Sequence, residues 1–375
     1  MLITVWLLCL ISLAWAHTTF TTLYVDEVNQ GDGVCVRMNH NGETATFPIA
    51  PLASKDIACG VDGEKAVSRV CPAKASSRLT FEFREYPDAT QPGAIDISHK
   101  GPCAVYMKKV DDATADNNAA GDGWFKIFHL DYDPQAGKWC TEKLMDNHGL
   151  LSVNIPADVA PGYYLVRPEL LALHNADASP PDPQFFVGCA QLFVQGDGTA
   201  RPPTVAIGEG TYHLDLPGLT FNIYDQPLKL PYPMFGPPVY QGGQGASVKA
   251  VDVKAKQVVQ DKGTKPAGCI LVRDNWCAFE VPAYDSEDSC WASSEKCWNE
   301  SDVCWNTAPP TGSAVCQIWQ DKCTAIDEGC SDGQWSGPPN QGKDLTPPAK
   351  IMNGSNDIFT KATPKRVNMK RRITQ

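Results

Sequence analysis

Short apolar or alternating segments recur along residues 17–240, with Gly, Pro, Asn and Asp between them. Runs such as "RLTFEFREY", "CAVYMKKV" and "QFFVGCAQLFV" show no sustained helical periodicity. Many short strands separated by turn residues are typical of an antiparallel β-sandwich. The pattern therefore predicts an all-β, immunoglobulin-like or fibronectin-like sandwich. Polar stretches such as "DDATADNNAAGDG" and "HNADASPPDP" predict long loops, where functional sites are often built.

A different period governs the last third of the chain. "CWASSEKCWNESDVCW" repeats Cys-Trp every seven residues, and Cys316, Cys323 and Cys330 follow at the same interval. Because seven residues are about two helical turns, each set lines one face of a helix, and the two faces can be cross-bridged. We therefore expect a small disulfide-rich module at residues 269–335. Zinc is the rival, but closely spaced Cys-x-x-Cys ligand pairs are absent from this sequence.

The tryptophans of this repeat allow two interpretations. Trp291, Trp298 and Trp305 either form a carbohydrate-binding strip or pack in the core of the module. The sequence leaves both open.

The remaining segments are polar or terminal. Residues 241–268 are Gly- and Lys-containing and predict a linker, while residues 336–375 end in "KATPKRVNMKRR" and predict a disordered basic tail. Residues 1–16 form an uncharged apolar run that is too short to span a bilayer. With Ala14 and Ala16 as a small-x-small pattern, this run predicts a signal peptide whose removal makes His17 the N-terminus.

Cysteine usage and charge agree with secretion. Of fifteen cysteines, Cys9 lies in the leader; six of the other fourteen fall in the predicted sandwich and eight in the module. Even numbers in each part predict pairing within each part in an oxidising, extracellular compartment. The formal net charge of −11 disfavours nucleic acid as a partner. We expect a secreted monomer with no transmembrane span.

An N-terminal histidine has a particular chemistry. Its α-amine and its ring Nδ1 can close a chelate on one metal ion, and the amine releases its proton more readily than a lysine. A second imidazole would complete three nitrogens, a donor set that suits Cu(II). Sequence spacing does not choose that imidazole from the remaining candidates, which are His40, His99, His129, His148, His174 and His213.

Six ordered motifs carry a resemblance along residues 17–240. They are "HTTFTTLYVDEVNQGDGVCVRM", "DISHKGPCAVYMKKV", "GDGWFKIF", "IPADVAPGYYLVRPELLALH", "QFFVGCAQLFV" and "FNIYDQPLKLPYPMFGPPVY". In these motifs the chain resembles the fungal copper-dependent lytic polysaccharide monooxygenases of auxiliary-activity family nine. A cysteine-rich module of unassigned function follows some members of that family, and the module here is similar to it.

The resemblance implies a site with one copper ion per chain. It assigns His17 as the chelating N-terminal ligand and His99, in "SHKGP", as the second histidine ligand. It assigns His174 and Gln184 as the residues that hydrogen-bond the oxygen co-substrate. It also implies a disulfide between Cys59 and Cys189, whereas three connectivities stay open for the other four sandwich cysteines.

Two positions depart from the family pattern. The family usually has a tyrosine on the copper's axial side, whereas this chain has Phe186, which strand periodicity places on the same face as Gln184. Tyr232 resembles an aromatic residue that stacks on sugar rings, although the usual "PGP" after it is "FGP" here. Tyr232 therefore either binds substrate or packs its own loop.

Two functions remain at this point. The first is a secreted copper enzyme that uses an external electron donor and oxygen or hydrogen peroxide. Its substrate would be the surface of a β-linked polysaccharide, cellulose or a related β-glucan, cleaved oxidatively at C1 and/or C4. The alternative is a non-catalytic copper-binding or cell-wall-binding protein. Phe186 favours the alternative, whereas His174 and Gln184 favour catalysis.

Overall fold

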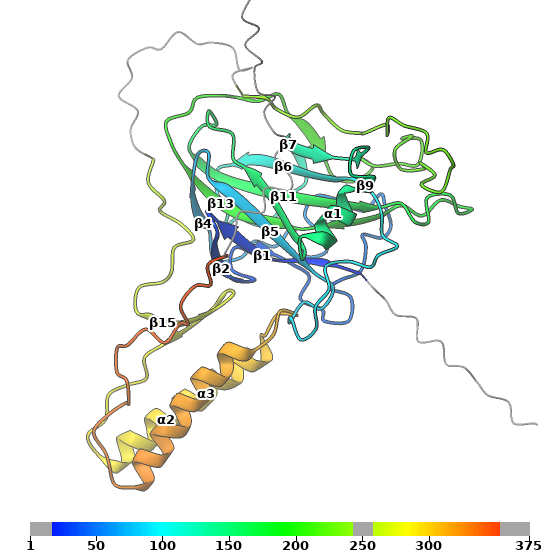
Figure 1. The fold of residues 1–375 in the computed structure, drawn as a ribbon. Coiled ribbons are helices and arrows are strands. Elements are labelled where there is room, and N and C mark those ends of the chain that lie inside the picture. The colour runs from blue at the N-terminus through cyan, green and yellow to red at the C-terminus, as the bar shows by residue number, and fades with distance from the viewer. Residues whose placement is uncertain (1–16, 243–257, 353–375) are drawn as a thin grey trace, which may run out of the picture.

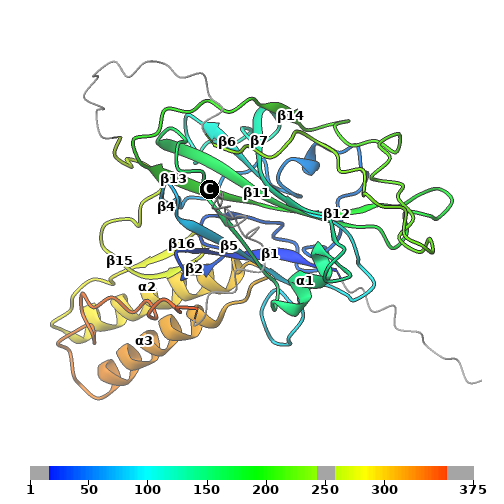
Figure 2. The same cartoon turned by 45° about the horizontal axis from the view of Figure 1, so that its top comes forward.

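Two antiparallel sheets form the N-terminal part of the computed structural model, which describes residues 17–242 and 258–352. The smaller sheet has the order β10 (Leu150–Asn154), β5 (Arg78–Arg84), β1 (Thr19–Val25), β2 (Val28–Asp32). Figures 1 and 2 show it as one layer against the larger sheet. The predicted antiparallel β-sandwich is confirmed.

The larger sheet is built around one long strand. Its order is β14 (Val205–Ile207), β7 (Gly121–Leu130), β6 (Cys103–Val110), β11 (Gly162–Ala172), β13 (Cys189–Gln195), β3 (Val36–Arg37). β12 (Gln184–Val187) pairs with β11, and β4 (Cys71–Lys74) pairs in parallel with β13. Smaller elements complete this part: η1 (Lys55–Ile57), β8 (Tyr132–Asp133), β9 (Lys138–Trp139) and α1 (Cys140–Asp146).

All residues of β11 are buried, because this strand is covered on both faces. Alternate residues of a strand point to opposite faces. Val166 and Leu170 accordingly join the core between the sheets, while Leu165 and Leu171 join a second cluster under the loops after β14. The same alternation on β12 directs Phe186 into the inter-sheet core and Phe185 into the second cluster.

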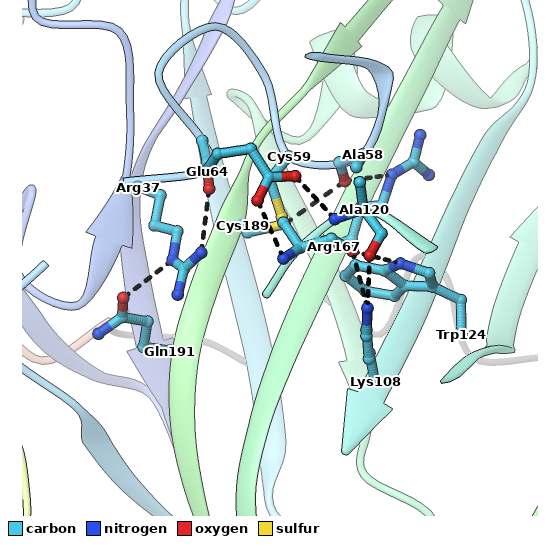
Figure 3. The surroundings of a disulfide bond; sticks show 12 residues. Arg37, Ala58, Cys59, Glu64, Lys108, Ala120, Trp124, Arg167, Cys189 and Gln191 are labelled. Atoms are coloured by element: carbon cyan, nitrogen blue, oxygen red, sulfur yellow. Dashed lines mark hydrogen bonds between the residues drawn. A yellow bond between two sulfur atoms is a disulfide. The ribbon is translucent and has the colours of Figure 1, made fainter. Parts of the chain in front are cut away.

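Three disulfides lie within the sandwich: Cys35–Cys71, Cys59–Cys189 and Cys103–Cys140. The second ties the loop after η1 to the start of β13. Figure 3 shows it beside Arg167, whose guanidinium Nε donates to the carbonyl of Ala58 at 2.8 Å. Since Arg167 is fully buried and also pairs with Glu169 at 2.6 Å, this corner of the sandwich is fixed by covalent and charge-assisted contacts.

The C-terminal module contains a hairpin of β15 (Cys269–Arg273) and β16 (Trp276–Phe279), followed by α2 (Glu287–Asn306) and α3 (Ala314–Ser331). Cys269–Cys277 closes the hairpin. Three disulfides join the helices in antiparallel order: Cys290–Cys330, Cys297–Cys323 and Cys304–Cys316. The predicted pair of cross-bridged helical faces is confirmed. No disulfide among the described residues joins the module to the sandwich.

The predicted linker between sandwich and module is described from residue 258 onward. Residues 258–268 belong to the expected linker. The backbone carbonyl of Gly263 accepts a hydrogen bond from the Val70 backbone N–H, and the Asp261 carboxylate accepts one from the Tyr163 hydroxyl at 2.6 Å. The first bond lies directly before β4, which among the described strands pairs only with β13, so a polar segment can be held there by its backbone. Residues 243–257 lie outside the described part.

The predicted tail at 336–375 is described as far as residue 352. Lys350 accepts a hydrogen bond from the Asn29 backbone, and Met352 donates one to Glu27, so that this segment lies along the edge strand β2. The composition of the tail did not reveal this, because the bonds involve backbone atoms. The basic residues after 352, like the predicted signal peptide at 1–16, lie outside the described residues.

Where the structure describes the chain, it contains no helix with the length and apolar character needed to cross a membrane.

Candidate metal centre

His17 stands at the start of the small sheet, directly before β1. The Thr18 hydroxyl donates to the carbonyl of Ala94, and Phe20 pairs with Phe83 of β5, so the first residues of the sandwich are fixed at one end of it. The ring of His17 is half-buried and meets Phe47 edge-on, with 5.3 Å between the ring centroids. Sequence reasoning missed Phe47, which carries no polar group to single it out.

His99 ends a tight turn between β5 and β6. Its backbone N–H donates to the carbonyl of Asp96, and its Nδ1 lies 3.1 Å from the Ser98 hydroxyl and 3.7 Å from an Asp96 carboxylate oxygen. The other ring nitrogen, Nε2, is buried and has no hydrogen-bond partner in the described residues. A histidine whose Nδ1 is held by neighbours and whose Nε2 is left over has the arrangement usual for a metal ligand.

The pairing of β11 with β12 brings His174 and Gln184 to the same end of the large sheet. Gln184 lies opposite Ala172, the last residue of β11, and His174 follows two positions later. Asp182 accepts a hydrogen bond from Gln184 Nε2 at 3.0 Å, which directs the amide and leaves its buried Oε1 without a partner there.

The structure gathers the predicted residues around His99. Its ring centroid lies 4.1 Å from that of His174, 5.9 Å from that of His17 and 5.7 Å from that of Phe186. Phe186 also lies 5.9 Å from the ring of His17, and it offers no oxygen atom to this group. The side chains arrive from the chain before β1, the turn before β6, the loop after β11 and β12 itself.

Burial keeps the three imidazoles of this cluster neutral at neutral pH. Desolvation, followed by the positive charge that His174 would carry, lowers the pKa of His99 to about 4. The pKa of His17 is lowered by the same two causes, and the pKa of His174 is lowered by desolvation. Because only neutral imidazole binds a metal ion, this environment favours ligation over protonation.

Tyr232 does not face the solvent. It is 4% exposed, its hydroxyl donates to the carbonyl of Gly218 at 2.7 Å, and its ring meets Trp139 edge-on. Of the two interpretations of this residue, the packing role fits these contacts. Tyr224 is 55% exposed instead, and its hydroxyl donates to the backbone carbonyl of His174 at 3.1 Å. Sequence reasoning missed Tyr224, although it stands in the same quoted motif.

The ring nitrogens of His17 and His99 suit a metal ion if the α-amine of His17 serves as a third donor. Among residues 17–242 and 258–352, no group of three His, Cys, Asp or Glu side chains is placed to hold a metal by itself. His17 and His99 therefore need a donor that is not a side chain, and the α-amine of an N-terminal His17 would be one. The unpartnered Nε2 of His99 is the atom that such an ion would satisfy.

Fold and site together define a class, a β-sandwich protein with a cluster of three histidines at one end. The chain belongs to Auxiliary Activity family 9 (formerly GH61), whose sequence model matches residues 17–232. Copper is the metal that membership of this family implies. The chain is an oxidoreductase of the lytic polysaccharide monooxygenase class, in keeping with the relatives it matches.

Two fungal relatives match most of the chain. The AA9 family lytic polysaccharide monooxygenase C of Aspergillus tamarii is 64% identical over 354 residues, covering 94% of this chain and 95% of the relative. The corresponding enzyme A of Emericella nidulans is 59% identical over 92% of this chain, which spans only 60% of that relative's length. Both matches are longer than the sandwich and so include residues of the C-terminal module.

Among solved structures, one named CvAA9A superposes with a TM-score of 0.53 at 33% sequence identity, covering 60% of this chain and 98% of its own. The extended catalytic domain of Hypocrea jecorina LPMO9A superposes with a TM-score of 0.50 at 22% identity and supports the fold alone.

Proposed function

We propose that this chain is a secreted, copper-dependent enzyme that oxidatively cleaves a β-linked polysaccharide, cellulose or a related β-glucan, at C1 and/or C4 of the glycosidic linkage. The observation that carries the proposal is the buried, unpartnered Nε2 of His99 beside the rings of His17 and His174. The matching fungal relatives are named as polysaccharide monooxygenases, which supports a polysaccharide as the substrate. Seven disulfides in the described residues support secretion, since such bonds persist in oxidising compartments.

One copper ion would be held by His17 and His99. After removal of residues 1–16, His17 would contribute its α-amine and Nδ1, and His99 its Nε2. Bound there, copper would supply one-electron redox chemistry toward oxygen or hydrogen peroxide. With oxygen as oxidant, hydroxylation of one carbon needs two electrons from an external donor and two protons, and the second oxygen atom leaves as water. The bond between the hydroxylated carbon and the glycosidic oxygen then breaks. That carbon becomes a carbonyl carbon, and the neighbouring sugar leaves as an alcohol that takes up the hydroxyl proton.

His174 and Gln184 would position the oxygen co-substrate. His174 presents a neutral ring whose Nδ1 is buried and unpartnered in the described residues, and Gln184 presents Oε1 in the same state. Asp182 holds the Gln184 amide nitrogen, so the carbonyl oxygen has a fixed orientation. Such preorganised polar groups act most strongly where little water competes, as at this half-buried end of the sandwich.

Phe186 would close the metal site on the side of the inter-sheet core, and its side chain has no atom that could bind the metal. Its ring is 2% exposed and packs in the inter-sheet core, so it excludes water from the side opposite the solvent. The chain therefore lacks the phenol oxygen usual in its family.

The test is a product assay. Copper-loaded mature protein with a reductant is incubated with a panel of insoluble and soluble glucans, and oxidised oligosaccharides are identified by mass spectrometry. His99→Ala should abolish them, whereas His213→Ala, which changes an exposed histidine paired with Asp215, should not. Absence of oxidised products from every glucan, or equal products from His99→Ala, would contradict the proposal.

A further inference from the structure

Helix α2 carries a row of tryptophans that the disulfides of the module do not require. Trp291, Trp298 and Trp305, called here the tryptophan strip, each follow a bridged cysteine. The equivalent positions on α3, after its own three bridged cysteines, are the exposed polar residues Gln317, Thr324 and Ser331. The disulfides between the two helices therefore do not require an aromatic residue after each cysteine, since the cysteines of α3 have none there.

Two rings of the strip face the solvent. Trp291 is 42% exposed and Trp305 is 41% exposed, although large aromatic side chains are usually much more buried. Trp298 between them is half-buried, and its indole N–H donates to Asp327 of α3 at 2.9 Å, which fixes its ring. The packing interpretation therefore fits the middle ring, whereas the outer rings are exposed to the solvent.

The spacing of the strip suits an extended polymer. Seven residues of an α-helix span about 10 Å, so the outer rings stand ~21 Å apart along one face. The step of about 10 Å between successive tryptophans is comparable with one disaccharide unit of an extended β-1,4-linked chain, in which every second sugar has the same orientation. The two outer rings are therefore about two such units apart. Flat aromatic rings contribute large apolar contact areas to such sugar faces.

The polar residues around the strip select a neutral partner. Helix α2 holds five acidic residues and one lysine. Glu295 and Asp302, both exposed, lie one turn after Trp291 and Trp298, where their carboxylates can accept hydrogen bonds from sugar hydroxyls. The negative charge opposes binding of nucleic acid, anionic lipid or an acidic polysaccharide.

From these observations we infer that the tryptophan strip of α2 is a binding surface for a neutral β-linked glucan chain, separate from the candidate metal centre. The choice of a glucan rests on the proposed function. Figure 1 shows the helix pair projecting from one side of the sandwich.

The test measures binding without turnover. Full mature chain, free of copper and reductant, is mixed with increasing amounts of microcrystalline cellulose, and the unbound protein is quantified. We expect Trp291→Ala/Trp305→Ala to weaken binding at least fivefold, while the matched pair Gln317→Ala/Thr324→Ala on α3 leaves it unchanged. Trp291→Tyr/Trp305→Tyr should restore a large part of the affinity, because a phenol ring also stacks on sugars.

Folding of each variant is checked by the absence of free thiols and by unchanged copper stoichiometry. Equal binding by the parent and the alanine pair, or no binding by the parent, would overturn the inference. A change of oligomeric state with unchanged glucan binding would also overturn it, by assigning the strip to contacts between copies of the chain. None of these results bears on the product assay, so the two proposals fail separately.

Discussion

The rings of His99 and His174 lie 4.1 Å apart, centroid to centroid, with their planes inclined by 32°. Two imidazolium cations at this distance would repel each other, and both rings are also partly desolvated. Desolvation lowers the pKa of both rings, and repulsion by His174 lowers the pKa of His99 further, which favours neutral rings at neutral pH. His99 has its Nδ1 beside the Ser98 hydroxyl and its Nε2 unpartnered in the described residues, whereas in His174 it is Nδ1 that has no partner there. The proposed ligand and the proposed positioning residue thus present different ring nitrogens.

The first prediction contrasts His99→Ala with Phe186→Tyr. Loss of His99 removes one of three proposed nitrogen donors, so Cu(II) affinity should fall by well over a hundredfold, roughly 3 kcal/mol or more. Phe186→Tyr adds only a weak contact and should change affinity by less than about tenfold, or ~1.4 kcal/mol, while altering the spectrum of the bound ion. Copper titration and electron paramagnetic resonance measure both effects.

The control for this pair is His213→Ala, which should bind copper like the parent because His213 is exposed and paired with Asp215. Parent-like affinity in His99→Ala, or an unchanged spectrum in Phe186→Tyr, would place the site elsewhere.

A second prediction concerns the N-terminus. Intact-mass analysis of the secreted protein should give a chain that begins at His17. A variant with one alanine retained before His17 keeps the imidazole and moves the amine, so we expect Cu(II) affinity to fall at least ~100-fold, about 2.7 kcal/mol. The same alanine placed after the C-terminal residue serves as the control. If retention of the alanine leaves the affinity intact, an amine of His17 is not a ligand.

Periodicity predicted the elements of this fold, whereas the assembly of the site needed the resemblance. Two-residue alternation identified the strands, and the seven-residue Cys-Trp repeat identified the bridged helices, because each pattern is set by local geometry. His99 and His174 meet only through the pairing of β6 and β11, which leaves no local signal. The burial of Tyr232 was likewise not predictable, since it depends on how a long loop packs over the large sheet.

A third prediction uses Lys126, which is buried on β7 and donates to the carbonyl of Phe235 at 2.6 Å. Burial lowers the pKa of Lys126 to about 8 against an ordinary value of 10.5, and Glu169 opposes this shift only in part. The unfolded chain then binds more protons than the folded one between these values. Below pH 8 the buried ammonium of Lys126 lowers the free energy of unfolding by its full amount. As the pH rises from 8 toward 10.5, the folded protein loses this charge before the unfolded chain does, so the free energy of unfolding increases.

Removing the titrating group should remove this slope. We expect Lys126→Met to reduce the pH dependence of the unfolding free energy between about pH 8 and 10 by up to ~1.4 kcal/mol per pH unit. Chemical denaturation of parent and variant across this range gives the difference, with exposed Lys229→Met as the control. Parallel curves for parent and Lys126→Met would show that Lys126 titrates normally in the folded state.

The last prediction concerns the fourteen cysteines after residue 16. The structure pairs all of them, three bonds in the sandwich and four in the module, so thiol titration of the denatured, unreduced mature protein should find no free sulfhydryl.

Cys297→Ser/Cys323→Ser removes the middle bridge between α2 and α3, whose cysteines are 26 residues apart. By the entropy of closing such a loop, the module should lose about 3 kcal/mol of stability. Copper binding should stay at the parent level, because no ligand of the proposed centre lies in the module. Calorimetry and copper titration on this double variant decide the matter. A free thiol in the parent would contradict the assigned pairing, and weakened copper binding in the variant would show that the module supports the metal centre.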